Sequence, residues 1–367
     1  MQIQKMGYCT ISDDNKNLMT YKHIKKLCSD NNLYDTDELN EVLYLHMKGF
    51  HNIDGLSTFK NLKCLFLNNN CIKKIENLND LVNLKALYLQ NNDISIIENI
   101  DCMSLVILNL SSNKIKKIEN LHHLKFLQTL NVSNNLIEDI EDIKEVAQIE
   151  NLSHLDLSHN NINFEKENEV KSLPDSVRNF PDICSEKKSN LNEMENEKIQ
   201  EYFMKENNNE TIMDYFHLYV NFHEEITKNE NPNIIKYHQN IQNMDQLAKK
   251  KFFFICEFII LLKKVKNLKT LFIKHNPFIN KFKYATKYLI ANIPNIVFLD
   301  DKKIKKEDIC LARIFLKKGA AEESELKKLF EQKKIDKYKN LTEKFHNFLL
   351  KKSESIESQS KGPIIID

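Results

Sequence analysis

Three histidines are the first candidates for chemistry in this sequence, because two of them recur at one position of a repeated pattern. His159 and His275 each precede an asparagine of the pattern, and His154 lies five residues before His159. Three imidazoles could hold a transition metal. The spacing places no carboxylate or thiolate with them, and the shared position is an exposed turn. We therefore favour surface histidines and predict no metal and no cofactor.

The other candidates for catalysis are weaker. Asp300 and Asp301 could form a carboxylate pair, but successive residues rarely face one another, and a capping role accounts for them. Cys64 could be a reactive thiol, yet no base is placed beside it. No set of nucleophile, base and orienting residue is found anywhere in the sequence. We therefore predict no catalytic residues and a protein that is not an enzyme.

Composition excludes several classes of function. The 367 residues carry 53 Lys and Arg against 52 Asp and Glu, and this balance argues against a general binder of nucleic acid or membrane surfaces. The five glycines are too scattered for a phosphate-binding loop, and the eight cysteines form no CxxC pair for zinc. No apolar run is long enough for a signal peptide or a membrane helix. We expect a cytoplasmic protein.

A repeated pattern is the strongest signal in the chain. The motif LxxLxLxxNxI occurs in five copies that start at Leu62, Leu84, Leu105, Leu127 and Leu152, and it returns at Leu268. Periods of about 22 residues with these leucines are typical of leucine-rich repeats. The asparagines of the pattern, which we expect to bind backbone groups of the turn, are Asn70, Asn92, Asn113, Asn135, Asn160 and Asn276.

The spacing within one copy predicts its fold. Leu65 and Leu67 are two residues apart, so both face the core from a short strand. Ile75 and Leu78 are three apart, which suits a tight turn on the outer side. One unit cannot bury its apolar face alone, so the units must stack. The predicted fold is an α/β leucine-rich-repeat solenoid of short 22-residue repeats, with a curved parallel sheet on the concave face.

Five regions follow from this pattern and its interruptions. We expect an N-terminal segment and capping helix at 1–38, repeats 1 to 6 at 39–163, a largely disordered Asn-rich insertion at 164–250, the last repeat and C-terminal cap at 251–319, and an amphipathic helical tail at 320–367. Thr20 is the expected N-cap of the first helix. Within the insertion, 212–222 could form a helix that binds a partner, but a tolerated loop expansion is favoured. The tail is either one helix or two broken around Lys337.

The concave face is the expected partner-binding surface. Its outward strand positions are poor in charge, with Asp156 and Lys274 the exceptions, and its first repeats carry aromatic residues, as protein-binding surfaces do. Tyr44, Phe66 and Tyr88 are the preferred anchors. A consensus origin explains the later Asn, Asp and Ser residues but not these three. The predicted binding residues are Tyr44, His46, Phe66, Asn68, Tyr88, Gln90, Ile107, Asn109, Asn131, Asp156 and Phe272.

Several stretches resemble one family. Residues 19–50, which end in LYLHMKGF, the repeats, the segment NPFINKFKYATKYL and the segment LDDKKIKKEDICLARIFLKKGAAEE are similar to the dynein axonemal assembly factor 1 family. The string at Leu43–Phe50 is the most specific part, since it departs from the repeat consensus. The resemblance implies no reaction. It implies a cytoplasmic protein that helps axonemal dynein chains to assemble, together with chaperones and other assembly factors.

The resulting functional hypothesis is a non-catalytic interaction scaffold in the cytoplasmic preassembly of axonemal dynein arms, for cilium or flagellum assembly and motility. Its expected partners are proteins, not nucleic acid, membrane or a small-molecule substrate, and association with the cilium or axoneme is a second expected location. Two alternatives stay open. A regulatory subunit of a protein phosphatase should show an acidic and aromatic stripe along the whole array. A structural axonemal light-chain-like repeat protein should be compact, without an insertion of about 90 residues.

Overall fold

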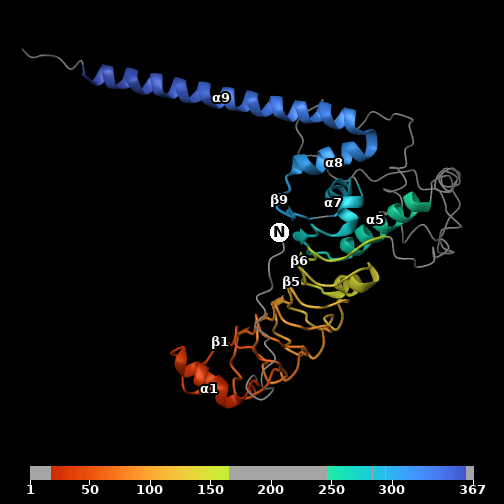
Figure 1. Ribbon diagram of the computed structural model, residues 1–367. Helices are drawn as coiled ribbons and strands as arrows, with labels where there is room; N and C mark the ends of the chain where they lie inside the picture. The colour runs from red at the N-terminus through yellow and green to blue at the C-terminus, as the bar shows by residue number, and fades with distance from the viewer. Residues whose placement is uncertain (1–17, 165–245, 283, 294, 361–367) are drawn as a thin grey trace, which may run out of the picture. The chain divides into compact units, whose positions relative to one another are not determined.

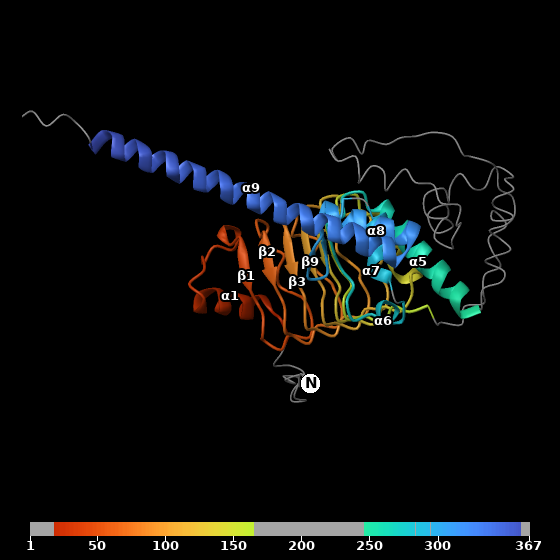
Figure 2. The same cartoon turned by 90° about the horizontal axis from the view of Figure 1, so that it is seen from above.

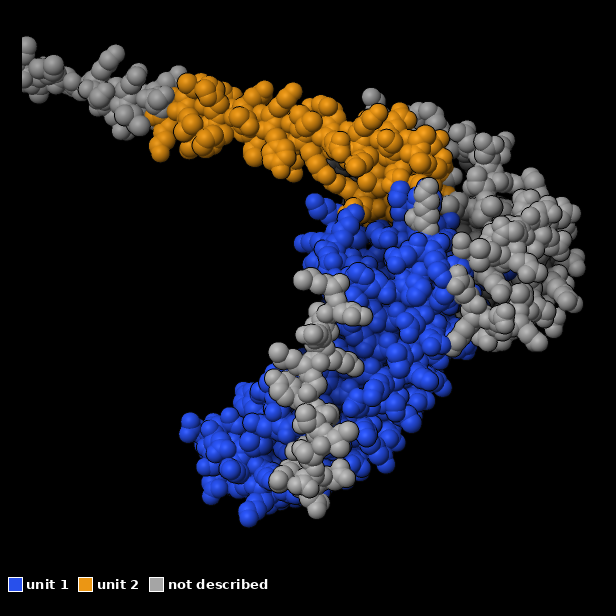
Figure 3. Space-filling model, in the orientation of Figure 1, with its two compact units in different colours: residues 1–187, 210–305 blue, residues 188–209, 306–367 orange. Residues whose placement is uncertain are grey.

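A computed structural model describes residues 18–164, 246–282, 284–293 and 295–360 (Figure 1). The chain divides into two units, residues 1–187 with 210–305 and residues 188–209 with 306–367 (Figure 3). The expected N-terminal segment up to residue 17, the expected helix at 212–222 and the expected insertion from 165 to 245 lie outside the described residues.

The first unit is built on one sheet whose described strands follow each other in chain order. Strands β1 to β8 pair in parallel, and β9 pairs with β8 in the antiparallel sense. The predicted leucine-rich-repeat solenoid is confirmed. The strands are β1 (Val42–Tyr44), β2 (Cys64–Phe66), β3 (Ala86–Tyr88), β4 (Ile107–Asn109), β5 (Thr129–Asn131), β6 (His154–Asp156), β7 (Thr270–Phe272), β8 (Phe298–Leu299) and β9 (Lys302–Lys303).

The register follows the leucine spacing. Leu65 pairs with Leu87, and Leu87 pairs with Leu108, so the central residues of neighbouring strands stack into a fully buried column. Because side chains alternate across a strand, the residues on either side of each leucine point to the opposite face and are partly exposed. The sheet stays continuous across the long interruption of the pattern, since Leu155 of β6 pairs directly with Leu271 of β7.

The outer side of the solenoid carries turns and helices. Figure 1 shows the strands along the inner side of the curve, with α5 (Gln246–Lys264) and α7 (Ala285–Asn292) on the outer side. The remaining outer elements are η2 (Glu141–Gln148) and α6 (Pro277–Lys281). Helix α5 begins at Gln246, before the expected start of the last repeat and C-terminal cap at 251, because the residues from Gln246 to Lys251 are good helix formers. It therefore begins inside the range that the sequence assigned to the insertion.

The N-terminal end of the sheet is covered by α1 (Tyr21–Asp30) and the turn η1 (Asp37–Leu39). The Thr20 side chain accepts a hydrogen bond from the His23 amide, which confirms it as the N-cap. Ile24 and Cys28 are the buried residues of this helix.

The second unit contains α8 (Lys306–Lys318) and α9 (Ala320–Ser360), joined at Gly319 with φ of 99°. Ile314 of α8 packs with Leu326 and Phe330 of α9 in a small core. Helix α9 continues without a break through Lys337, so the single-helix alternative for the tail holds (Figure 2).

Candidate partner-binding surface

One outward position of each strand forms a continuous row along the concave face, because parallel strands pair in register. The register places seven of the predicted binding residues side by side in one row: Tyr44, Phe66, Tyr88, Asn109, Asn131, Asp156 and Phe272. The structure divides this row into chemically different parts.

Tyr44, Phe66 and Tyr88, here called the aromatic row, form a stack over β1 to β3. The ring centroids of Tyr44 and Phe66 are 5.3 Å apart with planes at 12°, and those of Phe66 and Tyr88 are 4.6 Å apart at 3°. His46 meets the Tyr44 ring edge-on at 6.3 Å. Tyr44 is 41% exposed and the other two rings are half-buried. Stacked rings hold each other in place, so the row is an ordered, largely apolar surface on the concave face.

The side chains in the middle of the row form hydrogen bonds within their own repeats. Asn131 Oδ1 accepts hydrogen bonds from both the amide and the hydroxyl of Ser133. Asp156 Oδ1 binds Ser158 in the same way, at 2.9 and 2.6 Å. Asn109 accepts from the amide of the serine two residues later. These side chains close the turn after their strands, so the geometry favours a structural role for them over partner binding.

Of the other predicted residues, Asn68 and Gln90 follow the ends of two neighbouring strands, Ile107 lies at another outward position, and Phe272 lies farther along the row. The backbone carbonyls of Asn68 and Gln90 continue the sheet beyond β2 and β3 by accepting amides of the preceding repeat. Gln90 Oε1 is buried and has no hydrogen-bond partner among the described residues. Ile107 and Phe272 are half-buried, and β4 to β6 separate Phe272 from the aromatic row.

Sequence reasoning missed an exposed aromatic residue at the far end of the sheet. Phe298 of β8 pairs with Thr270 and is 40% exposed on the outward side of its strand. The signal was the apolar run at 297–299, whose strand register could have been continued from the last repeat. Beside it, Asp300 Oδ1 accepts the amides of Ile273 and Lys274. This carboxylate therefore caps the array and is not part of a catalytic pair.

The candidate metal site is reduced to two stacked rings. The ring centroids of His159 and His275 are 4.1 Å apart, as their shared repeat position predicts, whereas the His154 ring hydrogen-bonds to Ser153. Desolvation, with the neighbouring His275 second, lowers the pKa of His159. Within the described parts of the chain, no group of three His, Cys, Asp or Glu residues could hold a metal ion. Burial raises the pKa of the Cys64 thiol, which opposes a reactive thiolate.

The pattern asparagines join each repeat to the one before it. Asn113 is typical: its Oδ1 accepts the Ile94 amide, and its Nδ2 donates to the carbonyls of Leu89 and Leu110. Each bond satisfies a backbone group that is buried and would otherwise have no hydrogen-bond partner. The same double role is played by Asn70, Asn92, Asn135, Asn160 and Asn276.

Comparison with known proteins agrees with this architecture. A family model described as leucine-rich repeats in two copies matches residues 60–102 and 104–145, and a single leucine-rich repeat model matches 151–180. A dynein axonemal assembly factor 1 homolog of Drosophila melanogaster is 50% identical over 56 residues, and dynein axonemal assembly factor 1 of Mus musculus is 43% identical over 65. The chain is similar to dynein axonemal assembly factor 1. The resemblance drawn from the sequence is thus confirmed.

The similarity is short on both sides. These matches span 15% and 17% of this chain, and they cover 4% and 10% of the relatives' own length. Among solved structures, an internalin from Listeria monocytogenes is 31% identical, with a TM-score of 0.30, over 32% of this chain and 35% of the internalin. In the described residues, no helix is long and apolar enough to cross a membrane. The repeat fold and the named relatives support a protein-interaction role and point away from enzymatic activity.

Proposed function

We propose that this protein is a non-catalytic scaffold in the cytoplasmic preassembly of axonemal dynein arms, serving the assembly and motility of a cilium or flagellum. The observation that carries the proposal is the similarity to proteins named dynein axonemal assembly factor 1, at 43 to 50% identity. Its partners are then axonemal dynein chains, chaperones and other assembly factors. Because the chain covers a tenth or less of those relatives, this role is a proposal for the whole protein.

The aromatic row is the proposed contact for a dynein chain. Interface hot spots are rigid, partly exposed aromatic side chains ringed by weaker contacts, and Tyr44, Phe66 and Tyr88 meet that description. The stack is ordered before binding, so a partner loses little side-chain entropy on this side of the interface. Asn109, Asn131 and Asp156 are better suited to the rim of such a contact, because their side chains already bond within their own repeats.

The test is recovery of partners by tagged protein from cells that are building flagella. We expect the unmodified chain to recover axonemal dynein chains and chaperones from the soluble fraction. The double variant Phe66→Ala/Tyr88→Ala should lose most of this recovery, since hot-spot truncations cost about 2 kcal/mol or more, or roughly 30-fold in affinity. Phe126→Ala is the matched control, because it removes an exposed aromatic ring that lies outside the concave strand positions.

The outcomes separate the hypotheses. Equal recovery of dynein chains by the double variant would move the binding site away from the aromatic row while leaving the assembly role intact. Recovery of a phosphatase catalytic subunit without any dynein chain would overturn the assembly role in favour of the phosphatase alternative. Stable recovery with finished axonemes, and none from the cytoplasm, would favour the structural light-chain-like alternative.

A further inference from the structure

Helix α9 exposes apolar side chains along the part that follows its contact with α8. That contact ends at Phe330, the last α9 residue of the shared core. Beyond it, large apolar residues are between 47% and 71% exposed, among them Ile335, Tyr338, Leu341, Phe345, Phe348 and Leu349. A helix that keeps so many apolar side chains on its surface normally packs them against another molecule.

These residues belong to a seven-residue repeat. Residues 335–341 read IDKYKNL and residues 342–348 read TEKFHNF. From their second position on, the two stretches match in kind: an acidic residue, a lysine, an aromatic residue, a lysine or histidine, an asparagine and a large apolar residue. Tyr338, Leu341, Phe345 and Phe348 are thereby spaced by three, four and three residues. This period is that of a helix whose apolar seam stays in contact with a second helix along its length.

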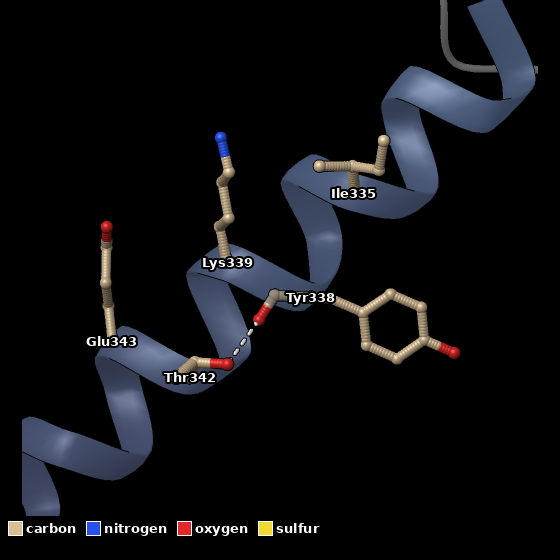
Figure 4. Close-up of a pocket in the computed structure, with 5 residues that line it drawn as sticks. All are labelled: Ile335, Tyr338, Lys339, Thr342 and Glu343. Atoms are coloured by element: carbon tan, nitrogen blue, oxygen red, sulfur yellow. Dashed lines mark hydrogen bonds between the residues drawn. The ribbon is translucent and has the colours of Figure 1, made fainter. Parts of the chain in front are cut away.

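A shallow depression on α9 lies beside the seam, on the side away from Lys337 and Lys344. It is lined by Ile335, Tyr338, Lys339, Thr342 and Glu343 (Figure 4). Tyr338 belongs to the seam and Thr342 borders it, whereas Lys339 and Glu343 lie farther round the helix. The Thr342 hydroxyl donates to the Tyr338 carbonyl at 2.9 Å. A partner can therefore cover this edge of the seam without leaving that hydroxyl unpaired.

Charge identifies the kind of partner. The lysine of the repeat recurs every seven residues and forms a basic column along one side of the seam, made of Lys337, Lys344 and Lys351. The other side of the seam is uncharged and is made of Ile335, Thr342 and Leu349. A second copy in antiparallel orientation would place lysine against lysine, and a parallel copy would place lysine against uncharged residues. Neither arrangement forms an ion pair across the seam.

We propose that this face of α9 binds an acidic amphipathic helix of another protein, whose heptads place Asp or Glu against the basic column. Apolar residues of that helix cover the exposed seam, and its carboxylates pair with Lys337, Lys344 and Lys351. This surface belongs to the second unit and the aromatic row to the first, and different variants test them, so the two proposals stand or fall independently.

The test uses the full chain and two synthetic helical peptides of repeated heptads. Both peptides carry Leu at the seam positions, one with Glu and the other with Lys at the flanking positions. We expect the Glu peptide to bind about tenfold or more tightly than the Lys peptide in fluorescence anisotropy, since several ion pairs sum to about 1.4 kcal/mol. The triple variant Lys337→Glu/Lys344→Glu/Lys351→Glu should reverse this preference.

The control also replaces lysines of α9 by glutamate, at two exposed positions before the seam begins: Lys327→Glu/Lys328→Glu. It should keep the preference for the Glu peptide. Phe345→Asp should abolish binding of both peptides with unchanged far-UV circular dichroism, because the ring is exposed and no core depends on it.

Three outcomes would overturn the proposal. The first is a preference for the Glu peptide that the triple variant and the control change equally. The second is a self-associating chain, detected by sedimentation, whose association is lost in Phe345→Asp, because the occupant is then a second copy. The third is binding to phosphatidylserine vesicles with none to either peptide, which would make the face a membrane surface.

Discussion

The pattern asparagines follow one another from repeat to repeat and are called here the asparagine ladder. Replacing one of them, Asn113→Ala, tests the view that these side chains hold the repeats together. Asn113 lies in the middle of the array and is buried. Its Oδ1 accepts the Ile94 amide at 3.0 Å, and its Nδ2 donates to the carbonyls of Leu89 and Leu110, each at 3.0 Å. Nδ2 also donates to the Ser111 carbonyl at 3.2 Å. Alanine removes all four bonds and leaves the leucine column untouched.

The size of the stability loss depends on which hydrogen bonds the backbone groups keep in the variant. The Leu89 carbonyl still accepts from Asn92 Nδ2, and the Leu110 carbonyl still accepts from Asn135 Nδ2. The Ile94 amide keeps no such second bond from the ladder. An orphaned buried amide costs about 1–3 kcal/mol, and each shared carbonyl bond contributes about 0.5–1.5 kcal/mol. Summed over the four lost bonds, the free energy of unfolding should therefore fall by about 2.5 kcal/mol or more.

Urea unfolding followed by far-UV circular dichroism measures this loss. The matched control is Asn83→Ala, whose exposed side chain makes one bond, to the Lys60 carbonyl at 3.1 Å. That variant should change the free energy of unfolding by about 0.5 kcal/mol or less. If the two variants lost equal stability, the ladder would not be the main link between repeats, and the reasoning from buried backbone groups would be refuted.

Three further predictions concern the N-terminal cap, a glycine of the first repeat and the stacked histidines. Thr20→Ala should lower the free energy of unfolding by about 1 kcal/mol through the lost N-cap, measured in urea; no change would contradict the capping assignment. Gly55→Ala should cost about 2 kcal/mol or more, because φ is +70° and a Cβ would lie 2.5 Å from the Tyr21 amide nitrogen; a neutral outcome in thermal unfolding would contradict that close approach. The pKa of His159 is lowered in the folded state, so stability should be full above about pH 6.5 and fall as pH drops through the folded pKa. His159→Asn, which keeps a residue suited to its φ of 54°, should flatten that fall in urea midpoints measured against pH; an unchanged slope would exclude the stacked pair with His275 as its cause.

The repeats could be predicted from the sequence because one spacing rule fixes both burial and register. A leucine at every second position of a strand must face the core, and the 22-residue period brings equivalent residues into pairing. The same rule predicts Tyr44 beside Phe66 and His159 beside His275, and both pairs of rings are stacked. It also joins β6 to β7 across more than a hundred residues, since the same spacing resumes at Leu268.

Side-chain hydrogen bonds are where the repeat pattern stops being informative. A strand register gives the position of Asn131 on the concave face but not the rotamer that turns its Oδ1 toward Ser133. That bond depends on the local turn after the strand. The repeat consensus therefore does not tell whether the Asn131 side chain closes this turn or is left to bind a partner. Phe298 was missed for a different reason. The last strands depart from the leucine pattern, so Phe298 is placed outward only by continuing the register of the last repeat into the apolar run at 297–299.

The structure separates the residues that hold the solenoid together from those proposed to bind a partner. The ladder asparagines and the strand leucines are buried between repeats, and their loss removes contacts that no neighbour replaces in full. Phe66 and Tyr88 flank the same leucines from the opposite face, where they are half-buried and stack on each other, and Phe66 also stacks on Tyr44. Truncating them removes ring stacking worth about 0.5–1.5 kcal/mol per pair, a small part of the stability of an array this long. A loss of partner binding in Phe66→Ala/Tyr88→Ala can therefore be assigned to the surface itself, provided that the urea midpoint stays close to that of the unmodified chain.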